Sequence, residues 1–109
     1  MEPIVDVTIT APDAEWLADF TRRLIEDRLV ASGNITENVR SIYRWQGEIE
    51  DATEAKVTLH TRVSLVPMIV ERTNAEHPYD VPQVLAVPVV DANPAYRRWV
   101  LDSTENFFT

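Results

Sequence analysis

The sequence predicts an α+β fold: a ferredoxin-like split βαβ sandwich with an antiparallel sheet, a long bent β-hairpin and an extra C-terminal helix. Three observations predict it. The elements follow the order strand, helix, strand, strand, helix, strand; the two middle strands join into one long hairpin; and a further helical segment follows the last strand. We expect residues 1–109 to form a single domain, because a chain of 109 residues can bury one core but not two.

The first strand is expected over residues 4–9, where the apolar residues are Ile4, Val5, Val7 and Ile9. Pro12 and Asp13 suit the start of a helix, since proline fixes φ and a carboxylate can cap the first amides. The helix places Leu17, Phe20 and Leu24 on one face, at spacings of three and four residues. Gly33 suits a left-handed or loop conformation after this helix.

The hairpin is the longest predicted element. Tyr43 and Trp45 share one face at a spacing of two, and Gly47 interrupts the alternation as a bulge or bend. Residues 50–53 then form the turn, after which the alternation runs to Arg62. An arm over residues 35–50 spans about 50 Å, whereas a domain of this size is about 35 Å across. The hairpin should therefore extend beyond its own domain, and we expect another copy of the chain to cover it.

The second helix is expected to begin with Ser64 as cap and Pro67 in its first turn, and to end by His77–Pro78. Its buried stripe is predicted to be Leu65, Met68, Ile69 and Thr73. The nearly continuous apolar run over residues 84–90 predicts a central strand that is covered on both faces.

The C-terminal helix begins at Asn93–Pro94, which read as cap and first helical residue. Its apolar positions at spacings of three and four are Tyr96, Trp99 and Val100. Phe107–Phe108 follow in a tail that is too apolar to lie in water without a partner.

Composition narrows the range of functions. A formal charge of −8 and a pI near 4.6 argue against nucleic acid as a partner, because such proteins need clustered Lys and Arg. The absence of cysteine excludes disulfides and thiolate metal sites. No apolar stretch is long enough to span a membrane, so we expect no membrane partner and a cytoplasmic location. No catalytic motif is present, and we expect no enzyme activity and no required cofactor.

Two motifs carry a resemblance to a known family. The segments Ser41-Ile42-Tyr43-Arg44-Trp45-Gln46-Gly47 and His77-Pro78-Tyr79-Asp80-Val81-Pro82 match the SxYxWxG and HPYxxP elements of the CutA family, the divalent-cation tolerance proteins. The match also includes segments 10–13 and 29–35, Glu54, Tyr96 and Trp99, and spans most of the chain. The resemblance implies a ferredoxin-like homotrimer, similar in architecture to PII signalling proteins, whose hairpins pack across subunits.

The resemblance also implies a role in tolerance of divalent metals, copper above all, but the chain departs from the family pattern. Ile9 and Ser32 stand where copper-binding relatives have cysteines, and His60 stands where the family has a lysine. Glu76–His77 replace a histidine pair, which makes these two residues the candidate ligands for Cu(II) or another divalent cation. Without thiolates to select Cu(I), one imidazole and one carboxylate are too few for a tight site within one chain.

Several residues keep two interpretations. His77 is either a hydrogen-bonded histidine at a turn or a metal ligand. His60 is either a partly exposed strand residue or part of a ligand site. Tyr43 and Trp45 either bury against a neighbouring subunit or stack on a ligand. The acidic residues near the predicted bend form either a solvated loop or a weak cation site; they are Glu48, Glu50, Asp51 and Glu54.

Two functions follow as hypotheses. The first is a CutA-like homotrimer that acts in the response to divalent metal ions and binds metal weakly at most. The second is a PII-like signalling or scaffold trimer that binds a small anionic ligand or a partner protein at the cleft between subunits, where Arg40, Arg44 and Arg62 could hold an anion. The residues expected at this cleft or interface are Tyr43, Arg44, Trp45, Glu54, His60, Tyr79 and Trp99.

Overall fold

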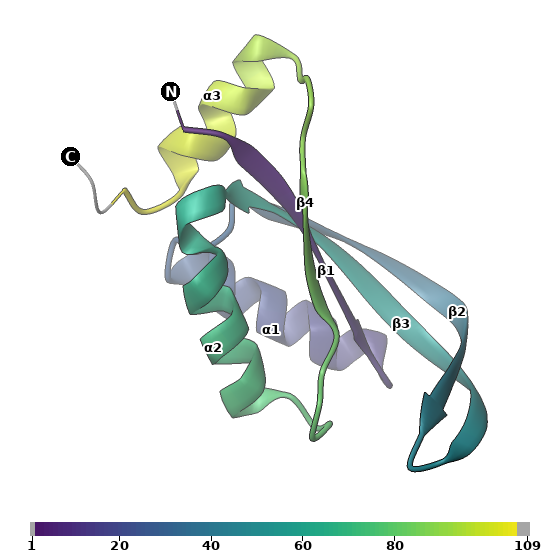
Figure 1. The fold of residues 1–109 in the computed structure, drawn as a ribbon. Coiled ribbons are helices and arrows are strands. Elements are labelled where there is room, and N and C mark those ends of the chain that lie inside the picture. Colours follow the sequence, from purple (N-terminus) through teal and green to yellow (C-terminus); the bar gives the residue numbers. More distant parts are fainter. Residues whose placement is uncertain (1, 107–109) are drawn as a thin grey trace.

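The computed structural model describes residues 2–106 and confirms the predicted α+β, ferredoxin-like fold (Figure 1). Within this range no helix is long and apolar enough to cross a membrane. The elements in chain order are β1 (Ile4–Ala11), α1 (Ala14–Glu26), β2 (Ser32–Trp45), β3 (Glu48–Arg62), the short 3-10 helix η1 (Val63–Leu65), α2 (Val66–Glu76), β4 (Val84–Pro88) and α3 (Pro94–Ser103).

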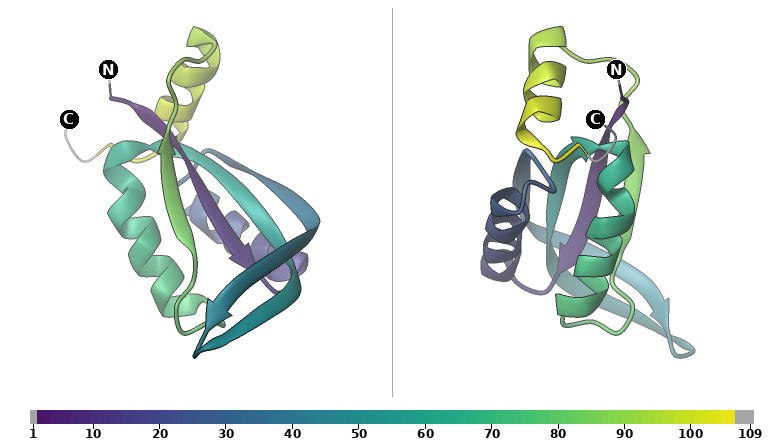
Figure 2. Two further views of the ribbon diagram at one scale, coloured as in Figure 1. Left: turned by 45° about the vertical axis from the view of Figure 1, so that its right-hand side comes forward. Right: turned by 90° about the vertical axis from the view of Figure 1, so that its left-hand side faces the viewer.

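The four strands form one antiparallel sheet in the order β2-β3-β1-β4. Helices α1 and α2 lie against the same face of this sheet (Figures 1 and 2). The side chains between the two layers form the main core, which includes Val7, Ile9, Phe20, Leu59 and Ile69. Helix α3 lies at the end of the sheet opposite the hairpin tip, where Val100 packs with Ile4 and Ala31.

The first strand and helix form as predicted. The Asp13 carboxylate accepts a hydrogen bond from the amide of Glu15 at 3.0 Å and so caps α1. The predicted stripe of Leu17, Phe20 and Leu24 is fully buried.

The expectation for Gly33 was wrong, because this glycine lies inside β2, and Arg28 instead takes the positive φ of 60° after the helix. Gly33 serves close packing. A Cβ atom at this position would come within 2.8 Å of the Thr21 methyl group and about as close to Leu59 and Val57.

The hairpin turns earlier than the sequence indicated. Gln46 and Gly47 form a two-residue turn with φ angles of 51° and 83°, while residues 50–53 lie inside β3. Positive φ at both central residues is the type I′ pattern, which matches the twist of paired strands. The bend lies at a register shift between Thr36 and Val39, where Asn38 has a φ of 59°. Gly47 was read as a bend because Gln46 carries no signal for a turn of this type.

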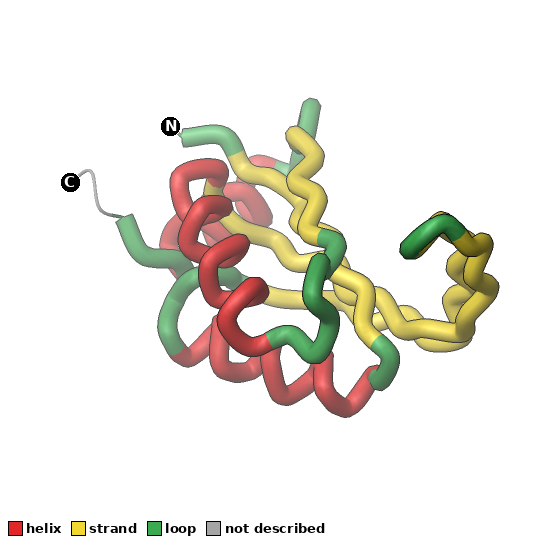
Figure 3. The backbone as a smooth tube through the Cα atoms, turned by 60° about the horizontal axis from the view of Figure 1, so that its bottom comes forward, coloured by secondary structure: helices red, strands yellow, loops and turns green. Residues whose placement is uncertain are grey.

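The hairpin extends beyond the body of the domain, as the length argument predicts (Figure 3). The described residues measure 46 Å along their longest axis and 26 and 24 Å along the other two. Ile42 and Ile49 near the tip are 64% and 70% exposed. A single chain therefore leaves the apolar side chains of its own hairpin uncovered.

Helix α2 ends at Glu76, with His77 as its C-cap, which agrees with the predicted end by His77–Pro78, but its start differs from the prediction. Leu65 occupies the cap position, and the Ser64 hydroxyl, which was expected to cap the helix, makes no cap hydrogen bond to the described residues. Leu65, Ile69 and Thr73 are buried, whereas Met68 is 40% exposed and does not belong to the stripe.

Strand β4 lies at the edge of the sheet and not at its centre, which corrects the prediction from its apolar run. Its alternate residues Leu85 and Val87 are 58% and 55% exposed on the face opposite α1 and α2, and so are left uncovered by the described residues. At α3, Asn93 caps the helix through the amide of Ala95 as expected. The predicted role of Phe107–Phe108 lies outside the described residues.

Candidate functional site

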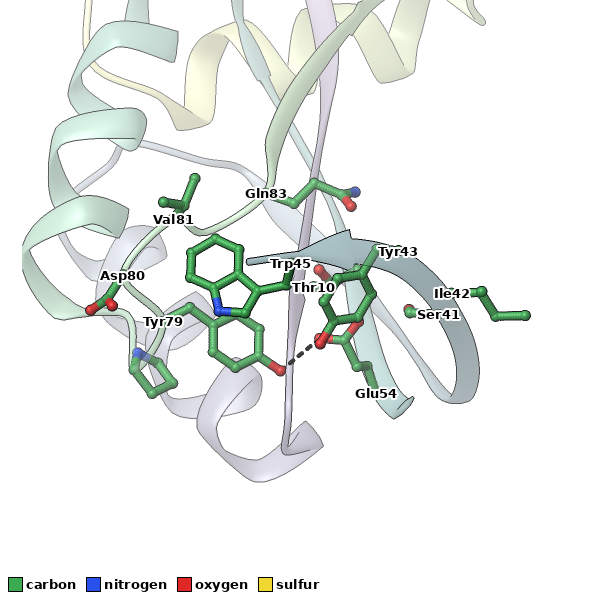
Figure 4. Close-up of a pocket in the computed structure, with 11 residues that line it drawn as sticks. Thr10, Ser41, Ile42, Tyr43, Trp45, Glu54, Tyr79, Asp80, Val81 and Gln83 are labelled. Carbon is green, nitrogen blue, oxygen red and sulfur yellow. Dashed lines mark hydrogen bonds between the residues drawn. The ribbon is translucent and has the colours of Figure 1, made fainter. Parts of the chain in front are cut away.

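A cleft of about 630 Å³ lies between the hairpin tip and the segment that joins α2 to β4 (Figure 4). Its volume is in the range of small-molecule sites. The residues that line it are Thr10, Ser41, Ile42, Tyr43, Trp45, Glu54, Pro78, Tyr79, Asp80, Val81 and Gln83. Four of the predicted site residues therefore meet here, namely Tyr43, Trp45, Glu54 and Tyr79.

Glu54 and Tyr79 form the polar centre of the cleft. The Tyr79 hydroxyl donates a hydrogen bond to Glu54 Oε2 at 2.7 Å, and Figure 4 shows the Tyr43 ring beside the same carboxylate. Glu54 is only 6% exposed. Burial, followed by the hydrogen bond to Glu54, raises the pKa of Tyr79 above its ordinary value of 10.0. Tyr79 is therefore a neutral donor at physiological pH, and none of the ion pairs among the described residues gives Glu54 a cationic partner.

His77 holds the segment that carries Tyr79. Its Nδ1 accepts a hydrogen bond from the Tyr79 amide at 3.0 Å, and its Nε2 lies 2.8 Å from the Thr10 carbonyl oxygen. A nitrogen that faces a carbonyl must carry the proton, so the ring is the neutral Nε2–H tautomer. The ring is packed at 4.9 Å between Trp16 and Tyr79. The interpretation of His77 as a hydrogen-bonded histidine at the helix–strand turn is confirmed.

Glu76, the other candidate metal ligand, is held by two arginines. Its carboxylate accepts hydrogen bonds from Arg72 at 2.9 Å and from Arg23 at 2.9 Å, and Arg72 also pairs with Asp27 at 2.7 Å. Hydrogen bonding to Arg72, opposed by burial and supported by Arg23, lowers the pKa of Glu76. In this arrangement neither Glu76 nor His77 offers a free donor, and the described residues contain no group of three His, Asp or Glu that could hold a metal ion. The pair therefore does not fit a resident metal.

The remaining predicted site residues lie away from the cleft. His60 and Trp99 are near the opposite end of the sheet, and the Tyr96 ring contacts the rings of both. His60 Nδ1 also lies 2.8 Å from Asp6 Oδ1. Tyr96 is 6.0 Å from the His60 ring and 5.5 Å from the Trp99 ring, centre to centre. Arg44 remains at the hairpin tip, where its Nη1 is 3.5 Å from the Gly47 carbonyl oxygen.

The three arginines considered for an anion are not brought together. Arg40 pairs with Asp51 through two hydrogen bonds of 3.0 and 2.7 Å, and none of the three lines the cleft. Arg62 is buried at the other end of β3, where it contacts Glu2, Thr104 and the Leu101 carbonyl oxygen. The acidic cluster is likewise divided, since Glu54 enters the cleft while Asp51 pairs with Arg40.

Sequence reasoning did not name the other residues that line the cleft, which are Thr10, Ser41, Ile42, Pro78, Asp80, Val81 and Gln83. Thr10 lies in segment 10–13, which was considered as the helix start and as part of the family match but not as part of a site, and its backbone carbonyl oxygen lies 2.8 Å from His77 Nε2. Asp80 lies inside the HPYxxP motif, so the motif itself was the available signal. Gln83 had no signal, because its place depends on how the hairpin tip curls toward β4.

The family model described as CutA1 divalent ion tolerance protein matches residues 5–103 of the chain. A mouse protein named Protein CutA is 38% identical over 90% of this chain, and the Thermus thermophilus divalent-cation tolerance protein CutA is 38% identical over the same share. The Arabidopsis chloroplastic CutA is 33% identical over 95% of the chain. The chain spans 55% of the mouse relative, 57% of the Arabidopsis relative and 95% of the Thermus relative.

Solved structures agree with these sequence matches. The Thermus thermophilus CutA1 structure has a TM-score of 0.90 at 36% identity and covers 94% of this chain and 99% of its own. The rice CutA1 structure has a TM-score of 0.91 at 33% identity, with 95% of each chain covered. With the family model over nearly the whole chain, relatives above 30% identity and the same fold, this chain belongs to the CutA1 divalent ion tolerance protein family.

Proposed function

We propose that the chain forms a homotrimer that acts in the response of the cell to divalent metal ions, copper above all. The observation that carries the proposal is membership of the CutA1 divalent ion tolerance family over residues 5–103. The Thermus relative is named for tolerance of divalent cations. A cytoplasmic location stays a prediction, because the names of relatives include a chloroplastic and a periplasmic CutA.

Self-association is supported by surfaces that one chain leaves open. The hairpin extends beyond the domain, with Ile42 and Ile49 exposed near its tip. The edge strand β4 presents Leu85 and Val87 on the face opposite α1 and α2. Exposed edges and apolar strands of this kind are normally covered by a partner. A closed ring of three identical subunits would cover both the hairpin and the edge strand. Sedimentation at micromolar concentration tests this assembly, and the expected mass is three times the 12.5 kDa of one chain.

Metal binding in this proposal is weak at most. Glu76 and His77 would first have to release their hydrogen bonds to Arg72, Arg23, Thr10 and the Tyr79 amide. Imidazole and carboxylate without thiolate suit Cu(II) better than Cu(I). The response to metal would then run through a partner or a change of assembly and would need no tight site.

Calorimetric titration with Cu(II) tests the ligand assignment. The parent, His77→Ala and the matched control His60→Ala are compared, because these are the two histidines of the chain. A smaller heat of Cu(II) binding for His77→Ala alone supports His77 as a ligand of the metal ion. Identical isotherms for all three proteins exclude it, and a change in His60→Ala alone moves the site to the Asp6–His60 pair.

Ligand-dependent signalling or scaffolding is the second candidate function. The observation that favours it is the cleft, which gathers four predicted site residues around a buried carboxylate. A bound ligand would raise the melting temperature by mass action, so a thermal-shift screen of small charged molecules separates this candidate from the metal response. A screen without any shift would count against it.

A further inference from the structure

We propose that the cleft binds a small organic ammonium ion, whose charge lies against the Glu54 carboxylate and whose carbon groups lie against the rings of Tyr43 and Trp45. This inference names the ligand class for the second candidate function and does not depend on the metal response. It replaces the anionic ligand that the sequence suggested, because the lining residues have the opposite charge.

The first argument for an ammonium ligand is the negative charge of the residues that line the cleft. Glu54 and Asp80 are the charged residues of the lining, and no Lys, Arg or His is among the side chains that line it. Glu54 is 6% exposed, and none of the described ion pairs includes it. A carboxylate removed from water without a cation nearby is costly, so a ligand that brings a positive charge is favoured over one that brings a negative charge.

The second argument is that hydrogen bonds hold the Glu54 carboxylate in place. Tyr79 donates to Oε2 and thereby fixes the carboxylate, while Oε1 has no hydrogen-bond partner among the described residues. Tyr79 is itself fixed, since its amide is bound to His77 and His77 is bound to Thr10. The acceptor is therefore held in place before a ligand arrives, which reduces the entropy lost on binding.

The third argument is the set of aromatic rings that line the cleft. Tyr43, Trp45 and Tyr79 all line the cleft, and Tyr43 and Trp45 are 43% and 39% exposed in one chain. Aromatic faces attract ammonium groups, and carboxylate and rings together are how quaternary ammonium ligands are recognised. A divalent metal ion fits this lining less well, because the described residues contain no group of three His, Asp or Glu that could hold one, and the rings and the Ile42 and Val81 side chains offer it no donor. The site thus favours an organic cation over a metal ion.

Isothermal titration of the parent with choline, ethanolamine and 3,3-dimethyl-1-butanol tests the proposal. The last compound has the shape of choline without its charge. We expect at least one of the two ammonium compounds to bind, and the neutral compound to bind at least tenfold more weakly than choline. Equal affinity for choline and its neutral analogue overturns the proposal, as does the absence of binding by both ammonium compounds. The second result is also expected if the hairpin of a neighbouring copy fills the cleft.

Two variants locate the site. Glu54→Gln keeps the shape of the side chain and should weaken ammonium binding at least tenfold, whereas Glu50→Gln removes the same charge from an exposed position on the same strand and should change nothing. Trp45→Leu should weaken binding several-fold. Unchanged binding by Glu54→Gln contradicts the proposal. Cu(II) titration and sedimentation of the parent are separate measurements. A negative result in either would contradict the metal response or the trimer, and it would not affect the result for ammonium binding.

Discussion

The Glu54–Tyr79 pair shows how single side chains fix the properties of the cleft. The hydroxyl and the carboxylate are 2.7 Å apart in surroundings with little water, and both effects favour the protonated phenol. Glu54 came from the family match and not from its strand pattern, because alternation alone places it with the exposed acidic residues of the hairpin. What alternation could not show was that Tyr79, 25 residues further along, would cover it.

The ionisation of Tyr79 gives a direct check. A raised pKa means that this tyrosine stays protonated above its ordinary value of 10.0, so the phenolate absorbance of the parent should show a separate second step at a pH well above 10.0. The second step should be missing in Tyr79→Phe, and Glu54→Gln should move it to lower pH. The sign follows from linkage: the pair stabilises the fold below pH 10.0 and loses that contribution as the pH rises through the folded value. A single step in the parent would contradict the geometry.

Gly33 is the second residue whose role depends on a contact that the sequence does not reveal. Gly33→Ala places a methyl group 2.8 Å from the Thr21 methyl, and overpacking of this kind should lower the free energy of unfolding by about 1–3 kcal/mol. Urea unfolding measures it. Thr21→Ser removes the clashing methyl, so the double variant should recover part of the loss. Strict additivity of the two substitutions would show that Thr21 and Gly33 do not meet.

At the scale of elements, patterning predicted which segments are helices and strands but not where the hairpin turns. Hydrophobic spacing found β1, α1 and the end of α2, since those boundaries carry capping residues or prolines. The turn at Gln46–Gly47 was missed because only its second residue is a usual choice for positive φ. The edge position of β4 was missed because an apolar run reads the same whether a helix or another subunit covers it.

The hairpin turn offers a pair of substitutions with opposite effects. Gly47→Ala forces a side chain into a φ of 83° and should destabilise the fold by about 1 kcal/mol. Gln46→Asn places a residue that tolerates positive φ at the other turn position and should stabilise it slightly. Urea unfolding midpoints should therefore move in opposite directions. Equal effects of the same sign would place the turn at residues 50–53 after all.

Helices α1 and α2 are joined by ion pairs of Glu76, and the contribution of these pairs to stability depends on pH. Glu76 on α2 joins Arg23 on α1 and Arg72, and its pKa is lowered from the ordinary 4.5. A lowered folded value means that this contribution is present above pH 4.5 and is lost as the pH falls through the folded value. The free energy of unfolding of Glu76→Gln should therefore fall less steeply than that of the parent between about pH 5 and 3. Parallel curves would show that Glu76 contributes no pH-dependent stability.

For the whole molecule, the open surfaces of one chain define what a partner copy must cover. Helices α1 and α2 cover one face of the sheet, whereas α3 meets only the end of the outer face, at residues such as Ile4 and His60. The same outer face leaves Leu85 and Val87 of the edge strand exposed. The cleft opens beside the same hairpin that extends beyond the domain. Assembly and ligand binding would therefore share elements, and a change in one is expected to alter the other.

The edge strand gives the test of assembly. Val87→Lys places a charge near the end of β4, on the face opposite α1 and α2, where a subunit interface would bury it. The substitution should weaken the proposed trimer at least a hundredfold, because an unpaired buried charge is costly. Ile25→Lys is the matched control, since Ile25 is also exposed, at 40%, but lies on α1, which packs on the other face of the sheet. Sedimentation velocity at micromolar concentration should show the control at the parent's mass and Val87→Lys near that of one chain. A parent that sediments as a folded monomer would overturn the trimer itself, whereas a trimeric Val87→Lys would move the interface away from β4 and leave the hairpin as the surface that holds the subunits together.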